Sequence, residues 1–404
     1  MGRNSIKALT ALTTLSILIG CSKAAQNASV IPGSFLYIST GICNSGSGFT
    51  APLVSNVGKT LARLNLSNQN YEIVKDYGDL SVEVAGTYVN GMVDGGDGYI
   101  YAAVENSGSI GSRRVDKITK TVYGAARPWY RNSSVLSTVI AGVARAADGG
   151  ILLGRTVAIE RFDSTPTRKM STPTLAWGEG FANACVGNNT NITGIISLPV
   201  LTGASYGKFI YSHQAAGKND IGIISMNGNT AATDCLANKP GGSVLVNSAT
   251  ATLGWGSTLS ASAAPASMVF VPTPNNGTIT GKLLVAYGSS AVNTVAANGL
   301  NNALVIYDVN EPTAASATIT NGKVLYHDVQ YFFGVSSIAY DQATSTLYAS
   351  SSNSLAVAPV GYNIEKFQID LTTPGATRLT NPDLSSFQAA NSFNNCVTGM
   401  FLGN

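Results

Sequence analysis

The chain has 404 residues, of which 45% are hydrophobic and only 11% are charged, and its formal net charge is +3. The charged share is less than half of the roughly 25% that is usual in soluble domains. This composition argues against an intrinsically disordered chain, and the lack of a basic run with interleaved aromatic residues argues against a nucleic-acid partner. The 43 glycines favour many short strands joined by turns over long helices.

The N-terminus has the organisation of an export signal. Arg3 and Lys7 precede the apolar run "ALTALTTLSILIG" (8–20), which is too short to span a bilayer comfortably, and Cys21 follows it. This resembles a bacterial lipoprotein signal peptide, and "LIGC" (18–21) matches the lipobox. The resemblance implies cleavage before Cys21, a diacylglycerol on its thiol and an acylated amine, and two or three such chains anchor a protein firmly. The alternative is an ordinary secretory peptide in which the Cys stands by chance.

The resemblance also implies how the chain is divided and where it works. Residues 1–20 would be the signal peptide and residues 21–33 a lipidated tether, and the strand repeats described below predict a single domain at residues 34–404. Ser22 follows the Cys, and in enteric-type sorting a residue other than Asp at this place favours the outer membrane. We therefore expect a cell-envelope protein held by its lipid in the outer membrane, on the periplasmic side or at the surface.

A repeated order of strands runs along the rest of the chain. In "VSSIAYDQATSTLYASSSN" (335–353) and "YNIEKFQIDL" (362–371), a strand ends at Asp341, and a turn and two further strands follow. The same order starts in four other segments, namely "VNGMVDGGDGYIYAAVEN" (89–106), "IAGVARAADGGILLG" (140–154), "ITGIISLPVLTGASYGKFIYSHQ" (192–214) and "ASMVFVPTPNNGTITGKLLVAYG" (266–288). A fourth short strand is expected after each third one, at "KTVYG" (120–124), "TLAWG" (174–178), "SVLVN" (243–247), "KVLYHD" (323–328) and "ATRLT" (376–380).

Four antiparallel strands in a radial repeat predict an all-β chain with a β-propeller fold. A small residue stands in the first strand of each repeat, where backbones approach closely around the axis. These residues are Gly91, Gly142, Gly194, Ser267, Ser337 and Gly399. The fold resembles NHL-like and YVTN-like propellers over nearly the whole mature chain.

The two ends of the chain complete each other. The C-terminal "CVTGMFL" (396–402) supplies only a first strand, whereas "GSFLYISTG" (33–41), "TLARLNL" (60–66) and "YEIVKDY" (71–77) supply a second, third and fourth. The C-terminal strand should therefore join the N-terminal blade and close the ring, which removes open sheet edges. This predicts six blades, and a seventh stays open because the intervals 194–267 and 267–337 are long.

Four cysteines remain after Cys21, and an even number in an oxidising compartment favours two disulfides. Cys43 follows the second strand of the N-terminal blade and Cys396 precedes its first strand, so a Cys43–Cys396 bond would lock the closure. Cys185–Cys235 follows by exclusion, although these two residues start on opposite faces of the ring.

One face of the ring should collect the loops that enter first strands and those that leave second strands. Aromatic side chains and an arginine gather in these loops, and such residues dominate binding hot spots and stack on sugar rings. They are Arg127, Trp129 and Tyr130, Trp255, and Tyr331 and Phe332. The alternative is that they pack against one another, plug the channel and shape long loops. The same face should carry Glu83, Glu105, Glu179 and His213.

No motif in the sequence calls for a cofactor or a metal ion. "DGGDG" (94–98) resembles calcium-binding glycine–aspartate runs, but it lies between a first and a second strand, where Asp–Gly favours a tight hairpin turn. No P-loop or dinucleotide fingerprint stands between a strand and a helix, and no nucleophile elbow stands out, although a Ser–His–Asp triad needs no fixed spacing. We expect no cofactor and no metal.

Two functions compete. The first is a lipid-anchored, non-enzymatic module that binds an envelope protein or glycan. The second is a metal-dependent hydrolase or lactonase at the channel mouth, because lactonases with six-bladed propellers hold calcium there with Glu, Asn and Asp. The second predicts acidic and amide side chains that converge on the axis from different first strands, and its candidates are Asp94, Glu105, Glu179 and His213.

Overall fold

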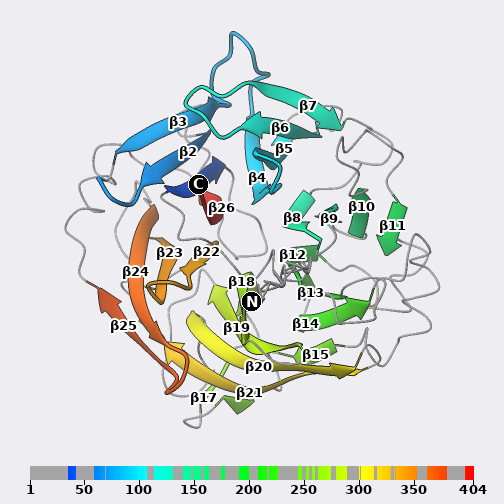
Figure 1. Ribbon diagram of the computed structural model, residues 1–404, viewed down its shortest axis with the longest axis vertical. Helices are drawn as coiled ribbons and strands as arrows, with labels where there is room; N and C mark the ends of the chain where they lie inside the picture. Colours follow the sequence, from blue (N-terminus) through cyan, green and yellow to red (C-terminus); the bar gives the residue numbers. More distant parts are fainter. Residues whose placement is uncertain are drawn as a thin grey trace, which may run out of the picture.

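The computed structural model describes a propeller built of strands alone. It covers residues 35–41, 59–68, 70–106, 113–130, 140–146, 149–155, 159–162, 174–177, 191–199, 208–215, 218–225, 244–247, 252–253, 257–259, 263–273, 279–288, 300, 302–313, 316–328, 332, 334–352, 362–379 and 396–404. Within these ranges the chain forms strands and turns without a helix, and so without a helical segment that could cross a membrane. The sheets stand side by side around a common centre (Figure 1).

The described strands form six four-stranded antiparallel sheets and one small two-stranded sheet. The first three sheets, from the inner to the outer strand, are β26 (Cys396–Gly403), β1 (Phe35–Gly41), β2 (Thr60–Asn65) and β3 (Tyr71–Asp76); β4 (Thr87–Asp94), β5 (Tyr99–Asn106), β6 (Arg114–Thr119) and β7 (Ala126–Tyr130); and β8 (Ile140–Arg145), β9 (Ile151–Arg155), β10 (Ile159–Phe162) and β11 (Thr174–Trp177).

The other half of the molecule repeats this order. Its three sheets are β12 (Asn191–Ser197), β13 (Lys208–Ala215), β14 (Lys218–Ser225) and β15 (Val244–Asn247); β18 (Ala264–Thr273), β19 (Ile279–Gly288), β20 (Ala303–Thr313) and β21 (Ser316–Tyr326); and β22 (Ile338–Asp341), β23 (Thr346–Ser352), β24 (Tyr362–Asp370) and β25 (Gly375–Leu379). The two-stranded sheet pairs β16 (Thr252–Leu253) with β17 (Ser257–Thr258).

The first strand of each sheet is its innermost strand. β4, β8, β12, β18, β22 and β26 contact one another in cyclic order, and β26 returns to β4. The small residues named in the sequence lie on these strands or immediately before β22, and all six line the central cavity. A Cβ added to Gly142 would lie 3.3 Å from Ile195 and 3.5 Å from the Cα of Gly194. The prediction that small residues mark the crowded centre is therefore confirmed.

The C-terminal strand β26 pairs with β1, the N-terminal strand of the same sheet. Their register sets Leu36 opposite Leu402 and Gly41 opposite Cys396. The rings of Tyr37 and Phe401 stack across this pair with centroids 4.9 Å apart. Segments from the two ends of the sequence thus share one sheet (Figure 1).

Apolar side chains between neighbouring sheets make the core. One cluster joins the first sheet, through Leu61 and Val74, to the second sheet, through Val89, Ile100 and Ile118, and all five are fully buried. The strands alternate across the pleat, so each sheet sends side chains to both of its neighbours. Because both faces of a strand can then be buried, the sequences of many strands are almost continuously apolar.

One predicted strand is wrong. Residues 120–124, "KTVYG", form the turn between β6 and β7, and the outermost strand of the second sheet is β7, which contains "RPWY" (127–130). Tyr123 has a φ of 46°, and a Cβ on Gly124 would lie 2.4 Å from the carbonyl oxygen of Thr119. The chain reverses too tightly here for an extended strand. The outer strands predicted at 174–178, 243–247 and 376–380 match β11, β15 and β25.

Candidate binding surface

Two of the predicted binding residues belong to the core. Trp129 lies in β7 instead of a loop, is 7% exposed, and packs edge-on against Tyr101 with ring centroids 4.9 Å apart. Phe332 is fully buried and packs against Tyr326 and Phe367. For these two side chains the packing alternative is correct, because pairs of large rings bury more apolar area against each other than an exposed loop allows.

The structure does not describe the side chains of the remaining predicted binding residues. Arg127 and Tyr130 belong to β7, and their side chains lie outside the description, as do Trp255 and Tyr331. Cys21, Cys43, Cys185 and Cys235 also lie outside the described residues, whereas Cys396 begins β26.

The predicted polar residues of this face have mixed positions. Glu83 lies in the loop between β3 and β4, as expected. Glu105 and His213 lie in strands β5 and β13 instead of loops, and Glu179 lies outside the described residues. Glu105 is 1% exposed and pairs with Nε of Arg113 at 2.5 Å, so its carboxylate serves the packing of the second sheet.

The segment "DGGDG" is the predicted hairpin turn between β4 and β5. Gly96 and Gly98 have positive φ values of 67° and 86°, which a residue with a side chain rarely adopts. Oδ1 of Asp94 accepts a hydrogen bond from the backbone N–H of Gly96 at 2.8 Å, and its Oδ2 lies 2.6 Å from Nζ of Lys120. Oδ2 of Asp97 lies 3.0 Å from Nζ of Lys117. Both carboxylates therefore have a lysine counter-charge.

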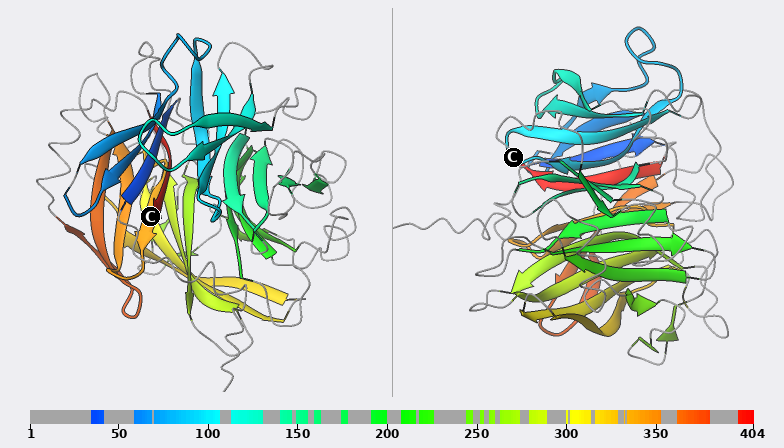
Figure 2. Two further views of the ribbon diagram at one scale, coloured as in Figure 1. Left: turned by 45° about the horizontal axis from the view of Figure 1, so that its top comes forward. Right: turned by 90° about the vertical axis from the view of Figure 1, so that its right-hand side faces the viewer.

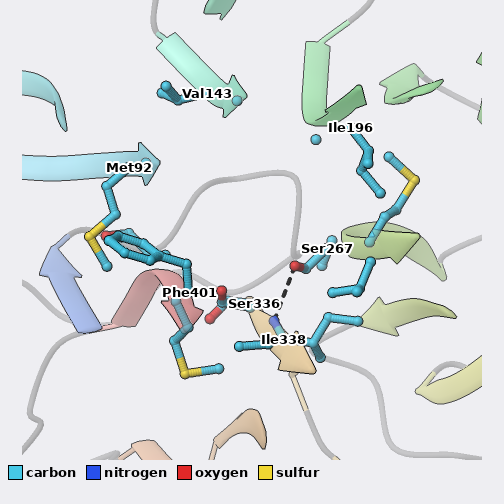
Figure 3. A pocket seen from close by; sticks show the side chains of 18 of the residues that line it. Met92, Val143, Ile196, Ser267, Ser336, Ile338 and Phe401 are labelled. Atoms are coloured by element: carbon cyan, nitrogen blue, oxygen red, sulfur yellow. Dashed lines mark hydrogen bonds between the residues drawn. The ribbon is translucent and has the colours of Figure 1, made fainter. Parts of the chain in front are cut away.

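The centre of the propeller holds a cavity of about 280 Å³, which is lined by glycine, apolar side chains and several hydroxyl side chains (Figure 3). Met92, Val143, Ile195, Met268 and Met400 line it from five inner strands. It adjoins a wider cavity of about 690 Å³, at the ends of these strands. Among the described residues, no group of three or more His, Cys, Asp or Glu side chains is placed to hold a metal ion.

A different surface stands out on the predicted face. The loop between β3 and β4, residues 77–86, projects beyond the neighbouring strands (Figure 1, Figure 2). Leu80, Val82 and Val84 are 54%, 67% and 58% exposed. Only two other large apolar side chains in the described part of the chain are exposed, Val122 and Tyr123 of the β6–β7 turn. These three exposed apolar side chains belong to one loop, and we call them the β3–β4 patch.

Local hydrogen bonds fix the backbone of this loop. Oδ1 of Asp79 accepts hydrogen bonds from the backbone N–H and the hydroxyl of Ser81, at 2.9 and 2.6 Å, and these bonds lower the pKa of Asp79. The hydroxyl of Thr87 donates to the carbonyl of Val84 at 2.7 Å, and Nδ2 of Asn106 donates to the carbonyl of Ala85 at 3.0 Å. These hydrogen bonds hold the backbone on both sides of the exposed side chains.

Buried charges anchor the base of the loop. The two carboxylate oxygens of Glu83 lie 3.0 Å from Nζ of Lys75, in β3, and 2.8 Å from Nη2 of Arg114, in β6. Nε of Arg114 also lies 2.8 Å from Oδ1 of Asp116, whose Oδ2 accepts a hydrogen bond from the hydroxyl of Tyr77 at 3.1 Å. This network joins the first sheet to the second and leaves no carboxylate in it without a counter-charge.

The network determines how its members ionise. Burial alone would lower the pKa of Arg114, but hydrogen bonds and charge pairing with Asp116 and Glu83 outweigh burial and raise it. Burial raises the pKa of Tyr77 well above its usual value, and the neighbouring charge of Asp116 acts in the same direction. Arg114 therefore stays charged and Tyr77 stays neutral at physiological pH.

The sequence analysis missed the β3–β4 patch. Its signal was the alternation of apolar and polar residues in "DLSVEVAG" (79–86), directly before a first strand. Alternation of this kind normally predicts a half-buried strand. It does not predict an exposed loop, which is what the segment forms.

Comparisons with known proteins give similarities of architecture. No protein-family model matches the sequence, and a search of curated proteins gave no match. A protein of unknown function from Bacteroides caccae is 13% identical with a TM-score of 0.43, over 92% of this chain and 98% of that one. Regucalcin, a calcium-binding protein from Agrobacterium tumefaciens, is 10% identical with a TM-score of 0.34, over 56% of this chain and 61% of its own.

A gluconolactonase from Xanthomonas campestris is 12% identical with a TM-score of 0.32, over 61% of this chain and 64% of its own. At these levels of similarity the comparisons carry no information about activity, because one propeller architecture hosts many unrelated functions.

Proposed function

We propose that this chain is a lipid-anchored module of the cell envelope that binds a protein partner through the β3–β4 patch. The observation that carries the proposal is the exposure of Leu80, Val82 and Val84 on a loop with a fixed backbone. An exposed apolar cluster is costly in water and marks an interaction site when it is contiguous and rigid. A loop that is already ordered loses little conformational entropy on binding.

The chemistry of the patch favours a protein over a glycan. Sugar rings are recognised by aromatic faces and by many hydrogen bonds, whereas Leu80, Val82 and Val84 offer branched aliphatic surface. The nearby charges of Glu83 and Arg114 are satisfied inside the network and do not point to a polar ligand. An apolar groove or strand edge on a second protein is the matching surface.

We infer that each four-stranded sheet is one blade and that six blades close into a ring. The pairing of β26 with β1 supports closure by the C-terminal strand, and the cyclic contacts of the six inner strands support the number. Of the two long intervals that left a seventh blade open, the interval 194–267 contains the small β16–β17 sheet in its described part.

The cellular setting of this proposal comes from the sequence. The lipobox at residues 18–21 supports lipidation of Cys21 and anchoring in the outer membrane, by resemblance to lipoprotein signals. Residues 22–33 form a tether that spans at most about 40 Å when fully extended. A partner of the β3–β4 patch would then be an envelope protein within that reach of the membrane.

The competing hydrolase reading gains no support from the described residues. It requires acidic and amide side chains that converge on the axis, but the described inner strands present mainly glycine, methionine, valine, isoleucine and serine there. Asp94 lies at the cavity's wider end and is paired with Lys120.

The test is crosslinking of the lipoprotein in its native membrane, followed by capture and mass spectrometry. We expect one reproducible protein partner, which is lost when Leu80, Val82 and Val84 are all changed to Ser. Val122→Ser is the matched control, because it removes an exposed apolar side chain from another turn and should retain the partner. A partner that survives the triple change contradicts the proposed surface. Failure to capture any partner, together with lactone hydrolysis that a chelator abolishes, would favour the hydrolase.

A further inference from the structure

The centre of the propeller contains an apolar space that the proposed partner surface does not use. The inner cavity of about 280 Å³ and the wider cavity of about 690 Å³ share Met92, Val143, Ile195, Met268 and Met400 as wall residues. They therefore adjoin along the axis. Glycine and apolar side chains predominate among the residues that line the inner part of this space (Figure 3).

Three hydroxyl groups in this wall are hydrogen-bonded to the protein. Oγ of Ser267 accepts a hydrogen bond from the backbone N–H of Ile338 at 3.1 Å (Figure 3). The hydroxyl of Ser336 donates to the carbonyl of Val397, and that of Thr398 donates to the carbonyl of Val89, at 2.6 Å. These bonds join neighbouring inner strands.

Glycine keeps part of this space open. A Cβ at Gly91 would lie 3.4 Å from Cγ2 of Val143, which is an ordinary van der Waals contact, and its φ is not in the left-handed region. The backbone thus does not require glycine at this position. Its lack of a side chain instead leaves room in the cavity, which Gly91 lines.

The wider cavity adds polar groups at one end. Asp94 and Lys120, paired at 2.6 Å, and Arg145 belong to its wall together with Phe270 and Phe401. Asp94 and Arg145 end the inner strands β4 and β8, whereas the β3–β4 loop enters β4 at its start. The wider cavity and the β3–β4 patch are therefore on opposite faces of the propeller.

We propose that this central space binds a single-chain amphiphile, with its unbranched hydrocarbon chain along the axis and its polar head at the wider end. Three methionines contribute flexible, polarisable side chains that adapt to a mobile chain. The narrow inner cavity suits one extended chain better than a fused-ring ligand. The charged groups of the wider cavity would remain in contact with water and with the head.

The experiment is isothermal titration of the full mature chain with octanoate, decanoate and dodecanoate below their micelle concentrations. The chain carries Cys21→Ser, so that it has no lipid of its own and needs no detergent. We expect one site per chain and an affinity that rises about fourfold with each added methylene, because each would be buried. Native mass spectrometry should show one dodecanoate bound per chain.

Two variants should block the site. Gly91→Leu and Val143→Phe place bulk in the inner cavity, and either one, if folded, should weaken dodecanoate binding at least tenfold. Gly375→Leu is the matched control for the first, because Gly375 begins the outer strand β25, and its affinity should be unchanged. Binding that is independent of chain length, or that persists in a folded blocking variant, would overturn the proposal. Binding that is lost instead on changing Leu80, Val82 and Val84 to Ser would also overturn it.

Discussion

Oε2 of Glu83 accepts a hydrogen bond from Nη2 of Arg114 at 2.8 Å, and the two side chains are only 9% and 8% exposed. Glu83 belongs to the loop that carries the β3–β4 patch, whereas Arg114 begins β6 of the second sheet. The second oxygen of Glu83 lies 3.0 Å from Nζ of Lys75 in the first sheet. One carboxylate thus fixes the loop to both sheets.

Removal of the negative charge of Glu83 should lower the stability of the folded chain. Glu83→Gln would leave Lys75 and Arg114 with less counter-charge in a buried setting, and we expect a loss of about 3 kcal/mol in the free energy of unfolding. Urea unfolding followed by circular dichroism measures this. Glu72→Gln is the matched control, because Glu72 is 35% exposed in its pair with Arg63 and should lose less than about 1 kcal/mol. Equal losses in the two variants would show that the network does not anchor the loop.

Buried tyrosines should limit stability at high pH. Burial raises the pKa of Tyr88 to about 12, with the charge of Glu105 acting in the same direction, and burial raises the pKa of Tyr348 to about 12. An unfolded tyrosine ionises near pH 10. The stability contributed by each is therefore fully present below about pH 10 and is lost as the pH rises towards 12.

Absorbance of tyrosinate at 295 nm measures this ionisation. We expect a fraction of the tyrosines to ionise only above pH 11, together with unfolding. Tyr88→Phe should retain more stability between pH 10 and 12 than the parent chain. A titration in which every tyrosine ionises reversibly near pH 10 while the fold persists would contradict the burial described here.

The contact between the C-terminal strand and the second sheet should depend on one hydroxyl. The hydroxyl of Thr398 donates to the carbonyl of Val89 at 2.6 Å and lies 3.0 Å from that of Ser39. Thr398→Val keeps the shape but leaves that carbonyl without this donor, and we expect a loss of about 1–3 kcal/mol. Thr373→Val, at an exposed turn, should change stability by less than about 0.5 kcal/mol. Denaturant midpoints compare the two, and equal shifts would argue against a role for β26 in holding the inner strands together.

The strand order could be read from the sequence because it depends on local patterns. Apolar–polar alternation, Asp–Gly turns and small residues in the first strands predicted the second, third and outer strands of most sheets. In "CVTGMFL" (396–402), the small residue between apolar residues predicted the first strand β26. These features are set by residues close together in the chain.

The exposure of individual side chains could not be predicted from these local patterns. Trp129 stands in a segment rich in polar neighbours, but Tyr101 from another strand covers it. "KTVYG" has the composition of a strand, and only the tight reversal at Tyr123 and Gly124 makes it a turn. Val82 alternates with polar residues like a strand residue, but it lies in a loop and is 67% exposed. In each case the outcome depends on contacts between distant parts of the sequence.

The disulfide prediction can be tested directly. Cys396 lies opposite Gly41, two residues before Cys43, in the register of β26 and β1. We expect non-reduced peptide mapping to recover a peptide that joins Cys43 to Cys396. Loss of this bond should destabilise the chain by up to about 4–5 kcal/mol, because the loop that it closes spans nearly the whole domain. Free thiols at both positions in protein prepared from the envelope would contradict the prediction.

Site-specific photocrosslinking tests the central claim most directly. A benzophenone amino acid is placed at Val82, at the centre of the β3–β4 patch, and separately at Thr372, an exposed position beside β25. The full-length lipoprotein is illuminated in its native membrane, and adducts are identified by mass spectrometry. We expect one protein adduct from Val82 and none of comparable yield from Thr372. Adducts of equal yield and identity from both positions, or none from Val82 in a folded and anchored protein, would contradict it.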